Sequence, residues 1–147
     1  MATEFTIVTA SEASPEALFD ASLDIDLHVR SMEGSAERAI AGVTTGRIGL
    51  GETVTWRARH FGVWFTMTSR ITALERPLGF VDEQVEGPFR SFVHEHAFRG
   101  AEQGSVMTDR ISVGSPVFGA LAERTVLVPY LRRLIIQRNR TIIETTR

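Results

Sequence analysis

The sequence contains no cysteine, and none of its sixteen basic residues is a lysine. Without a thiol, the chain can form no disulfide, hold no metal through thiolates and use no cysteine nucleophile. We attribute the all-arginine set mainly to genomic composition, although guanidinium groups also suit bidentate pairing with carboxylates. The formal net charge of −2 is too balanced to favour nucleic-acid binding.

Long apolar runs and the common catalytic motifs are also absent. No segment approaches the roughly 20 apolar residues that cross a bilayer, and the start, Met1–Phe5, carries neither a basic leader nor an apolar run. We therefore expect a soluble, cytoplasmic protein without membrane insertion. The lack of a glycine-rich phosphate loop, a nucleophile elbow and a His-Glu-x-x-His motif disfavours phosphoryl transfer, α/β-hydrolase and zincin chemistry.

What is present is the composition of one ordinary globular domain. The 147 residues are 43% hydrophobic and 23% charged, which excludes wholesale disorder. No repeat, low-complexity tract or linker rich in glycine, serine and proline divides the chain. We expect a single domain over residues 1–147.

The first third of the chain predicts one strand and two short helices. Residues 4–9 alternate as a strand does. Ser14-Pro15-Glu16 combines an N-cap, a first-turn proline and a first-turn acid, which is typical of a helix start. Asp24-Ile25-Asp26 predicts a second helix that runs to about Met32.

Strand patterns then dominate, with short turns between them, as in an antiparallel meander. The predicted strands are residues 37–43, 53–60, 63–74, 80–86, 89–99 and 105–113.

Beyond Pro116 the apolar residues recur at three- and four-residue spacings almost to the end of the chain. Leu131, Leu134 and Ile135 belong to this stripe, which predicts one long helix with a single apolar side. Pro129 predicts a kink near Thr125 or Val126. Such a helix must cover an apolar surface, and the sheet is the one large surface available.

Seven segments together match a known pattern: Asp24–His28, Gly51–Gly62, Gly87–Phe89, His94-x-His96-x-Phe98, Thr108–Arg110, Leu131–Leu134 and Gln137–Arg140. They resemble segments of the ligand-binding SRPBCC proteins of the START-like superfamily, in particular bacterial polyketide cyclase/dehydrase-like members. The resemblance implies an α+β helix-grip fold: a curved antiparallel sheet of six to seven strands, two short helices, and a long C-terminal helix packed across the sheet around a ligand cavity.

Strand parity predicts which side chains face the helix, because successive side chains of a strand point to opposite faces. The family pattern also directs Asp82 and Gln84 inward, whereas Val81 and Val85 argue for the opposite parity, so their direction stays open. The expected ligand-binding set is Trp56, Phe65, Met67, Asp82, Gln84, Phe92, His94, His96, Asp109, Leu131, Ile135 and Arg138. His28 could line the mouth of the cavity, but an exposed position on the helix is favoured.

Four polar residues of this set fall among apolar neighbours. A loop over residues 100–104 permits a register that pairs His94 with Asp109. Arg138 lies within the apolar stripe of the long helix, where a lone guanidinium would be prohibitive. It should therefore meet a carboxylate or a ligand anion.

Several interpretations of this polar set remain open. It can be a purely structural buried network, a network that orients the polar end of a ligand, or an acid–base pair of His94 with Asp109. His94 and His96 could hold a metal, but the sequence offers no convincing third ligand, so we expect neither a metal nor another cofactor.

The function predicted from these features is binding of a small, mostly apolar molecule such as a lipid or a polyketide. The alternatives are a cyclase or dehydratase that uses the His–Asp pair, and a protein-interaction module. The last alternative rests on the segment from Ser115 onward, which carries six arginines against two glutamates.

Overall fold

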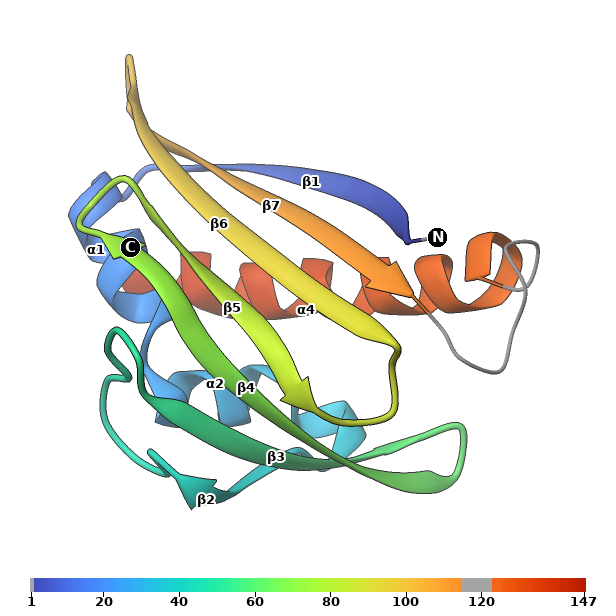
Figure 1. Cartoon of the computed structure of the whole chain (residues 1–147). Helices are drawn as coiled ribbons and strands as arrows, with labels where there is room; N and C mark the ends of the chain where they lie inside the picture. Colours follow the sequence, from blue (N-terminus) through green and yellow to red (C-terminus); the bar gives the residue numbers. More distant parts are fainter. Residues whose placement is uncertain (1, 115–122) are drawn as a thin grey trace.

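The computed structural model describes residues 2–114 and 123–147. Its sheet has seven antiparallel strands in the order β1-β7-β6-β5-β4-β3-β2 (Figure 1). The strands are β1 (Thr3–Ser11), β2 (Arg38–Gly42), β3 (Thr53–His60), β4 (Val63–Glu75), β5 (Gly79–Glu86), β6 (Ser91–Ala101) and β7 (Gly104–Gly114).

The helices lie together on one face of this sheet (Figure 1). They are α1 (Pro15–Ser22), α2 (Ile25–Ser31), the short η1 (Glu33–Ser35), the π-helical η2 (Glu123–Leu127) and the long α4 (Val128–Thr146). This is the α+β helix-grip arrangement that the sequence predicts, with α4 crossing the sheet. Among the described residues, no helix has the length and apolar character needed to cross a membrane.

Side-chain caps begin the two short helices where the sequence predicts them. Ser14 Oγ accepts a hydrogen bond from the backbone N–H of Ala17 at 3.1 Å, and Asp24 Oδ1 accepts one from that of Leu27 at 3.1 Å. Each cap satisfies one of the N–H groups that have no partner inside the helix.

The predicted irregularity of the long helix takes the form of a π-helical turn. Pro129 is the second residue of α4, and the π turn η2 precedes it at the position where a kink is expected. Proline is tolerated in a first turn because its missing N–H needs no partner there. Residues 115–122, where the sequence places the start of this helix, lie outside the described residues.

The register between β6 and β7 differs from the predicted one. The ladder continues to the pair Ala101↔Gly104, so His94 lies opposite Ile111 and His96 lies opposite Asp109. The predicted loop was too long, because only two residues form this turn. Gly104 has a φ of 106°, and a Cβ there would collide with the backbone of β1, so the turn requires glycine.

The core lies between the sheet and the helices. Phe19 of α1 is 1% exposed, and its ring meets those of Phe80 and Phe98 edge-on at centroid distances of 5.7 and 5.6 Å. A second cluster joins Ile135 of α4 to Ile111 and to residues of β1. The two short helices thus cover one end of the concave face, and α4 extends along the rest.

We predict that Phe19→Ala lowers the free energy of unfolding by about 3–5 kcal/mol, because it removes the ring that joins α1 to two strands. Urea denaturation followed by circular dichroism measures this change. The control is Leu78→Ala at a 57%-exposed position, where a change of about 0.5 kcal/mol or less is expected. Equal costs at the two positions would contradict the docking of α1 on the sheet.

Candidate ligand cavity and its polar network

A cavity of about 640 Å³ lies between the sheet and the helices. Its wall is mainly apolar, with polar groups gathered where β5 and β6 face α4. Ten of the twelve residues expected to bind a ligand line it: Trp56, Phe65, Met67, Asp82, Phe92, His94, His96, Leu131, Ile135 and Arg138.

The other two expected residues do not reach the cavity wall. Gln84 exchanges two hydrogen bonds with the backbone of Phe89, donating from Nε2 at 2.8 Å and accepting at Oε1 at 3.2 Å. It therefore closes the connection between β5 and β6. Asp109 is fully buried behind the wall.

Asp109 is the centre of the buried polar network. Its Oδ1 accepts from His94 Nε2 at 2.7 Å and from Arg138 Nη1 at 3.3 Å, and its Oδ2 accepts from Asn139 Nδ2 at 2.8 Å. Asn139 also donates to Thr9 Oγ1 at 3.1 Å. One carboxylate thus connects β7 and β6 with α4, and through Asn139 with β1, as the expected partner of Arg138.

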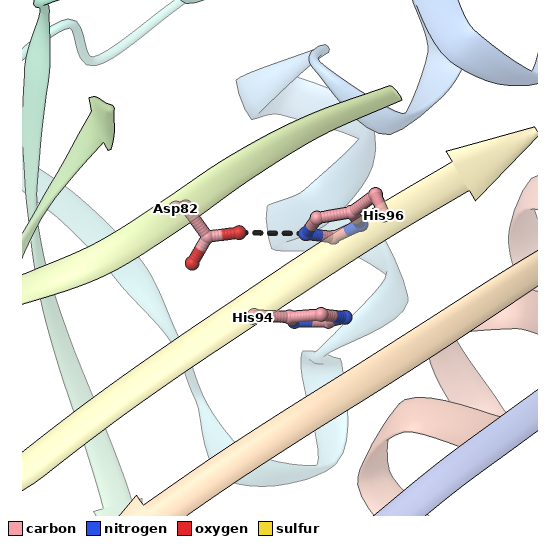
Figure 2. A group of neighbouring side chains, drawn as sticks. All are labelled: Asp82, His94 and His96. Atoms are coloured by element: carbon pink, nitrogen blue, oxygen red, sulfur yellow. Dashed lines mark hydrogen bonds and ion pairs between the residues drawn. The ribbon is translucent and has the colours of Figure 1, made fainter. Parts of the chain in front are cut away.

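The second carboxylate, Asp82 of β5, pairs with His96. Its Oδ2 lies 2.6 Å from His96 Nε2 (Figure 2). Arg138 Nη2 faces Nδ1 of the same ring at 3.4 Å. Because a guanidinium can only donate, Nδ1 accepts and the proton lies on Nε2, where it is donated to Asp82.

The two histidines bond diagonally across the sheet. Asp82 lies opposite His94 in the ladder and Asp109 lies opposite His96, yet each carboxylate binds the other histidine. The two imidazoles stack with centroids 3.7 Å apart, and His96 also stacks on Phe80 at 4.0 Å. This stack fixes both rings in place.

Burial and neighbouring charges set the protonation of the network. Burial lowers the pKa of His96 to about 4, with a further contribution from His94. Burial works to raise the pKa of Asp109, but the hydrogen bond from His94 and the charge of Arg138 outweigh it and hold that pKa below its usual range. The pKa of Asp82 is lowered too, since the hydrogen bond from His96 and the positive charge nearby, that of Arg138 included, together outweigh its burial. Both carboxylates are therefore ionised at neutral pH, and His96 is neutral.

Asp82, His94 and His96 together supply three atoms of metal-binding type within 4.8 Å of one another. Asp82 is the third ligand that the sequence did not reveal. The two histidine rings, however, are stacked with an angle of 19° between their planes. A nitrogen lone pair lies in the plane of its ring, so one ion cannot lie in the planes of both rings at once. The Nε2 proton of His96 also occupies its bond to Asp82. As arranged, the group is a hydrogen-bonded network, and both rings would have to turn to hold a metal.

Sequence reasoning missed several polar residues of the site. Asn139 follows Ile135 by four residues, so helical spacing could have placed it inward. Ser69 shares the parity of Phe65 and Met67; it lines the cavity, and its buried Oγ has no hydrogen-bond partner in the part of the chain that the structure describes.

His28 was expected to be exposed but lines the cavity. Its Nε2 lies 2.7 Å from Glu37 Oε1, and its ring packs against Trp56 at 4.4 Å. Glu37 itself is buried. This hydrogen bond between α2 and the residue before β2 forms a second polar group, and no local pattern in the sequence indicates it.

A contact between the β3–β4 turn and α4 forms the part of the cavity wall that lies nearest to solvent. His60 Nδ1 lies 2.6 Å from the hydroxyl of Tyr130, and the ring of Phe61 packs on Tyr130 at 4.4 Å. Burial lowers the pKa of His60 and raises that of Tyr130. Phe61 and Val63, which also line the cavity, are 63% and 53% exposed, so the cavity reaches solvent here.

The other arginines of the C-terminal segment do not enter the cavity. Unlike Arg138, these five residues are all exposed; they are Arg124, Arg132, Arg133, Arg140 and Arg147.

No family model and no curated protein matches this chain. Solved structures match nearly its whole length. The protein TTHA0849 from Thermus thermophilus is 16% identical, with a TM-score of 0.78 over 97% of this chain and 95% of that one. Major latex-like protein 151 from Panax ginseng is 14% identical, with a TM-score of 0.71 over 100% and 99% of the two chains.

A third match is the di-domain ARO/CYC StfQ from the steffimycin biosynthetic pathway. It is 13% identical, with a TM-score of 0.80 over 99% of this chain and 51% of that one. The likeness to these structures shows a shared fold, the helix-grip fold.

We predict that the protein loses stability as the pH falls from about 6.5 to 4. In this range the unfolded chain protonates His96 and the folded protein does not, so unfolding takes up a proton and becomes easier. From the shift of the His96 pKa to about 4, the loss is on the order of 3 kcal/mol. The depressed pKa of His60 acts in the same direction, whereas Asp82 and Asp109 contribute below about pH 4.

Urea midpoints at four pH values between 7 and 4 test this dependence. His96→Gln, which can still donate to Asp82 and accept from Arg138, should flatten the slope. Glu95→Gln, an exposed position on the same strand, should keep the slope of the parent protein. An unchanged slope in His96→Gln would show that His96 is not held neutral in the fold.

Proposed function

We propose that this protein binds a small, mostly apolar molecule in the cavity between α4 and the sheet. The observation that carries the proposal is the cavity itself, about 640 Å³ in volume and lined by apolar side chains with a few convergent polar groups. Ligand sites in proteins have volumes of about 300–1,000 Å³, and their walls likewise combine many apolar side chains with a few polar groups. A lipid, a polyketide or a metabolite of similar size fits this description.

The comparisons agree with this proposal at the level of the fold. StfQ is an ARO/CYC of a biosynthetic pathway, so a fold of this kind accommodates small metabolites. A shared fold does not transfer a function by itself, and the proposal therefore rests on the residues of this cavity. It requires no cofactor, and a cytoplasmic location stays a prediction from the sequence.

We predict that filling the cavity abolishes ligand binding. Met67→Trp places a bulky indole ring into the cavity from β4, whereas Thr66→Trp adds the same ring on the exposed face of that strand. Titration with the apolar fluorophore N-phenyl-1-naphthylamine should give binding that is about tenfold weaker or worse in Met67→Trp and unchanged in Thr66→Trp. Native mass spectrometry after gentle purification would show any ligand retained by the parent protein.

Equal binding by Met67→Trp and the parent protein would place the fluorophore outside the cavity. Thermal unfolding of both variants controls for damage to the fold, since overpacking a core costs about 1–3 kcal/mol.

A second candidate function is a cyclase or dehydratase reaction, and one contact favours it. His94 lines the cavity and is bonded at 2.7 Å to the buried Asp109. A carboxylate in this position fixes the orientation and the tautomer of the ring, as in general acid–base catalysis.

This second candidate predicts that the protein accelerates an aldol cyclisation of a reactive poly-β-keto thioester, in which a carbon–carbon bond forms and water is then lost. Mass spectrometry follows the product. His94→Asn should reduce the rate by about a hundredfold while N-phenyl-1-naphthylamine still binds. Product formation at the same rate with His94→Asn would leave ligand binding as the function that the site supports.

A further inference from the structure

The cavity wall carries an ionised carboxylate with one unused oxygen. Asp82 lines the cavity, and its side chain keeps 22% of its surface exposed. His96 binds Oδ2, but no hydrogen bond from the described residues reaches Oδ1. Figure 2 shows this second oxygen directed away from His96. A carboxylate oxygen in a mainly apolar cavity needs a hydrogen-bond donor.

The neighbouring ring offers a second acceptor. His94 uses Nε2 toward Asp109, so in the neutral imidazole Nδ1 has a lone pair and no proton. No hydrogen bond from the described residues reaches this nitrogen, and the ring faces the cavity. Asp82 and His94 are directly opposite each other in the β5–β6 ladder, so the two acceptors lie side by side.

Ser69 supplies an independent sign of a missing polar partner. It is 3% exposed and lines the cavity, and its Oγ has no hydrogen-bond partner among the described residues. On β4 it lies two residues from Ile71, which is opposite Asp82. Diagonal neighbours of this kind have Cα atoms about 7–8 Å apart. A polar ligand group at Asp82 is therefore within reach of the serine hydroxyl.

The cationic group of the wall is already occupied. Arg138 donates to Asp109 and Asn139 and faces His96. Among the described lining residues it is the one arginine, whereas three buried or half-buried carboxylates also line the cavity, namely Asp24, Glu37 and Asp82. A ligand carboxylate would meet a guanidinium whose charge is already paired with Asp109, and it would be repelled by Asp82.

On the basis of the proposed function, we infer that the ligand is an apolar molecule with a hydrogen-bond-donating head, a protonated amine above all, seated on Asp82, His94 and Ser69. Anionic lipids such as fatty acids are excluded. The amine donates to Asp82 Oδ1 as a charge-assisted hydrogen bond, which is stronger than a neutral one. A neutral alcohol can donate to the same acceptors, but without the attraction between charges.

Three ligands with the same twelve-carbon chain test this inference on the parent protein: dodecylamine, dodecan-1-ol and dodecanoate, each displacing N-phenyl-1-naphthylamine at pH 7. We expect the amine to bind tightest and the carboxylate weakest, with a difference of about tenfold or more between them. If the carboxylate binds as tightly as the amine, the inference is overturned while apolar ligand binding stands. If the fluorophore binds and none of the three displaces it, the inference fails as well; if nothing binds, the proposed function fails with it.

Asp82→Asn removes the charge but keeps an oxygen that can accept from His96. It should weaken the binding of dodecylamine by about tenfold and strengthen that of dodecanoate, with a smaller loss for dodecan-1-ol. The matched control is Glu83→Gln, which makes the same change of charge at the adjacent residue of β5, outside the cavity lining. Ser69→Ala should weaken the binding of dodecan-1-ol by a few-fold. Equal amine binding by Asp82→Asn and Glu83→Gln would contradict the seat at Asp82.

Discussion

The constraint on which this structure depends is that the buried carboxylate of Asp109 must be paired. An uncompensated charge in the interior is far more costly than a paired one, and Asp109 is fully buried. Its partners come from β6 and from two successive residues of α4, Arg138 and Asn139. The carboxylate therefore fixes where α4 crosses the sheet and how the ring of His94 is turned. The space between helix and sheet depends on that position.

The same pairing decides the polarity of the cavity. Because Arg138 is used to neutralise Asp109, its charge is not available to a ligand. The second carboxylate, Asp82, receives one hydrogen bond from His96, and its other oxygen receives none from the residues that the structure describes. The wall that remains is rich in acceptors, and beside them lies the hydroxyl of Ser69, to which no residue of the described ranges 2–114 and 123–147 bonds. A network that looks purely structural thus also determines which chemical groups the cavity can hold.

Prediction from the sequence succeeded where a single period decides the outcome. Alternation along β6 and β7 placed His94, His96 and Asp109 inward, and the 3.6-residue period placed Arg138 toward the sheet; all four are buried. The contact between His94 and Asp109 was expected from a register that is wrong by two residues. The bond between His94 and Asp109 forms nevertheless, because the imidazole of His94 reaches Asp109, its diagonal neighbour on β7. Parity could not decide the direction of Asp82, and it did not foresee that Gln84 would bond to the backbone of Phe89.

The sequence by itself determined the order of helices and strands, the caps at Ser14 and Asp24, and the inward sets of the central strands, because these follow from local periodicity and capping. Only the tertiary structure decided the pairing of each carboxylate, the bond between His28 and Glu37, and the contact of His60 with Tyr130. Each of these joins residues from different elements. Their distances depend on how the sheet bends and where α4 lies, which no local pattern contains.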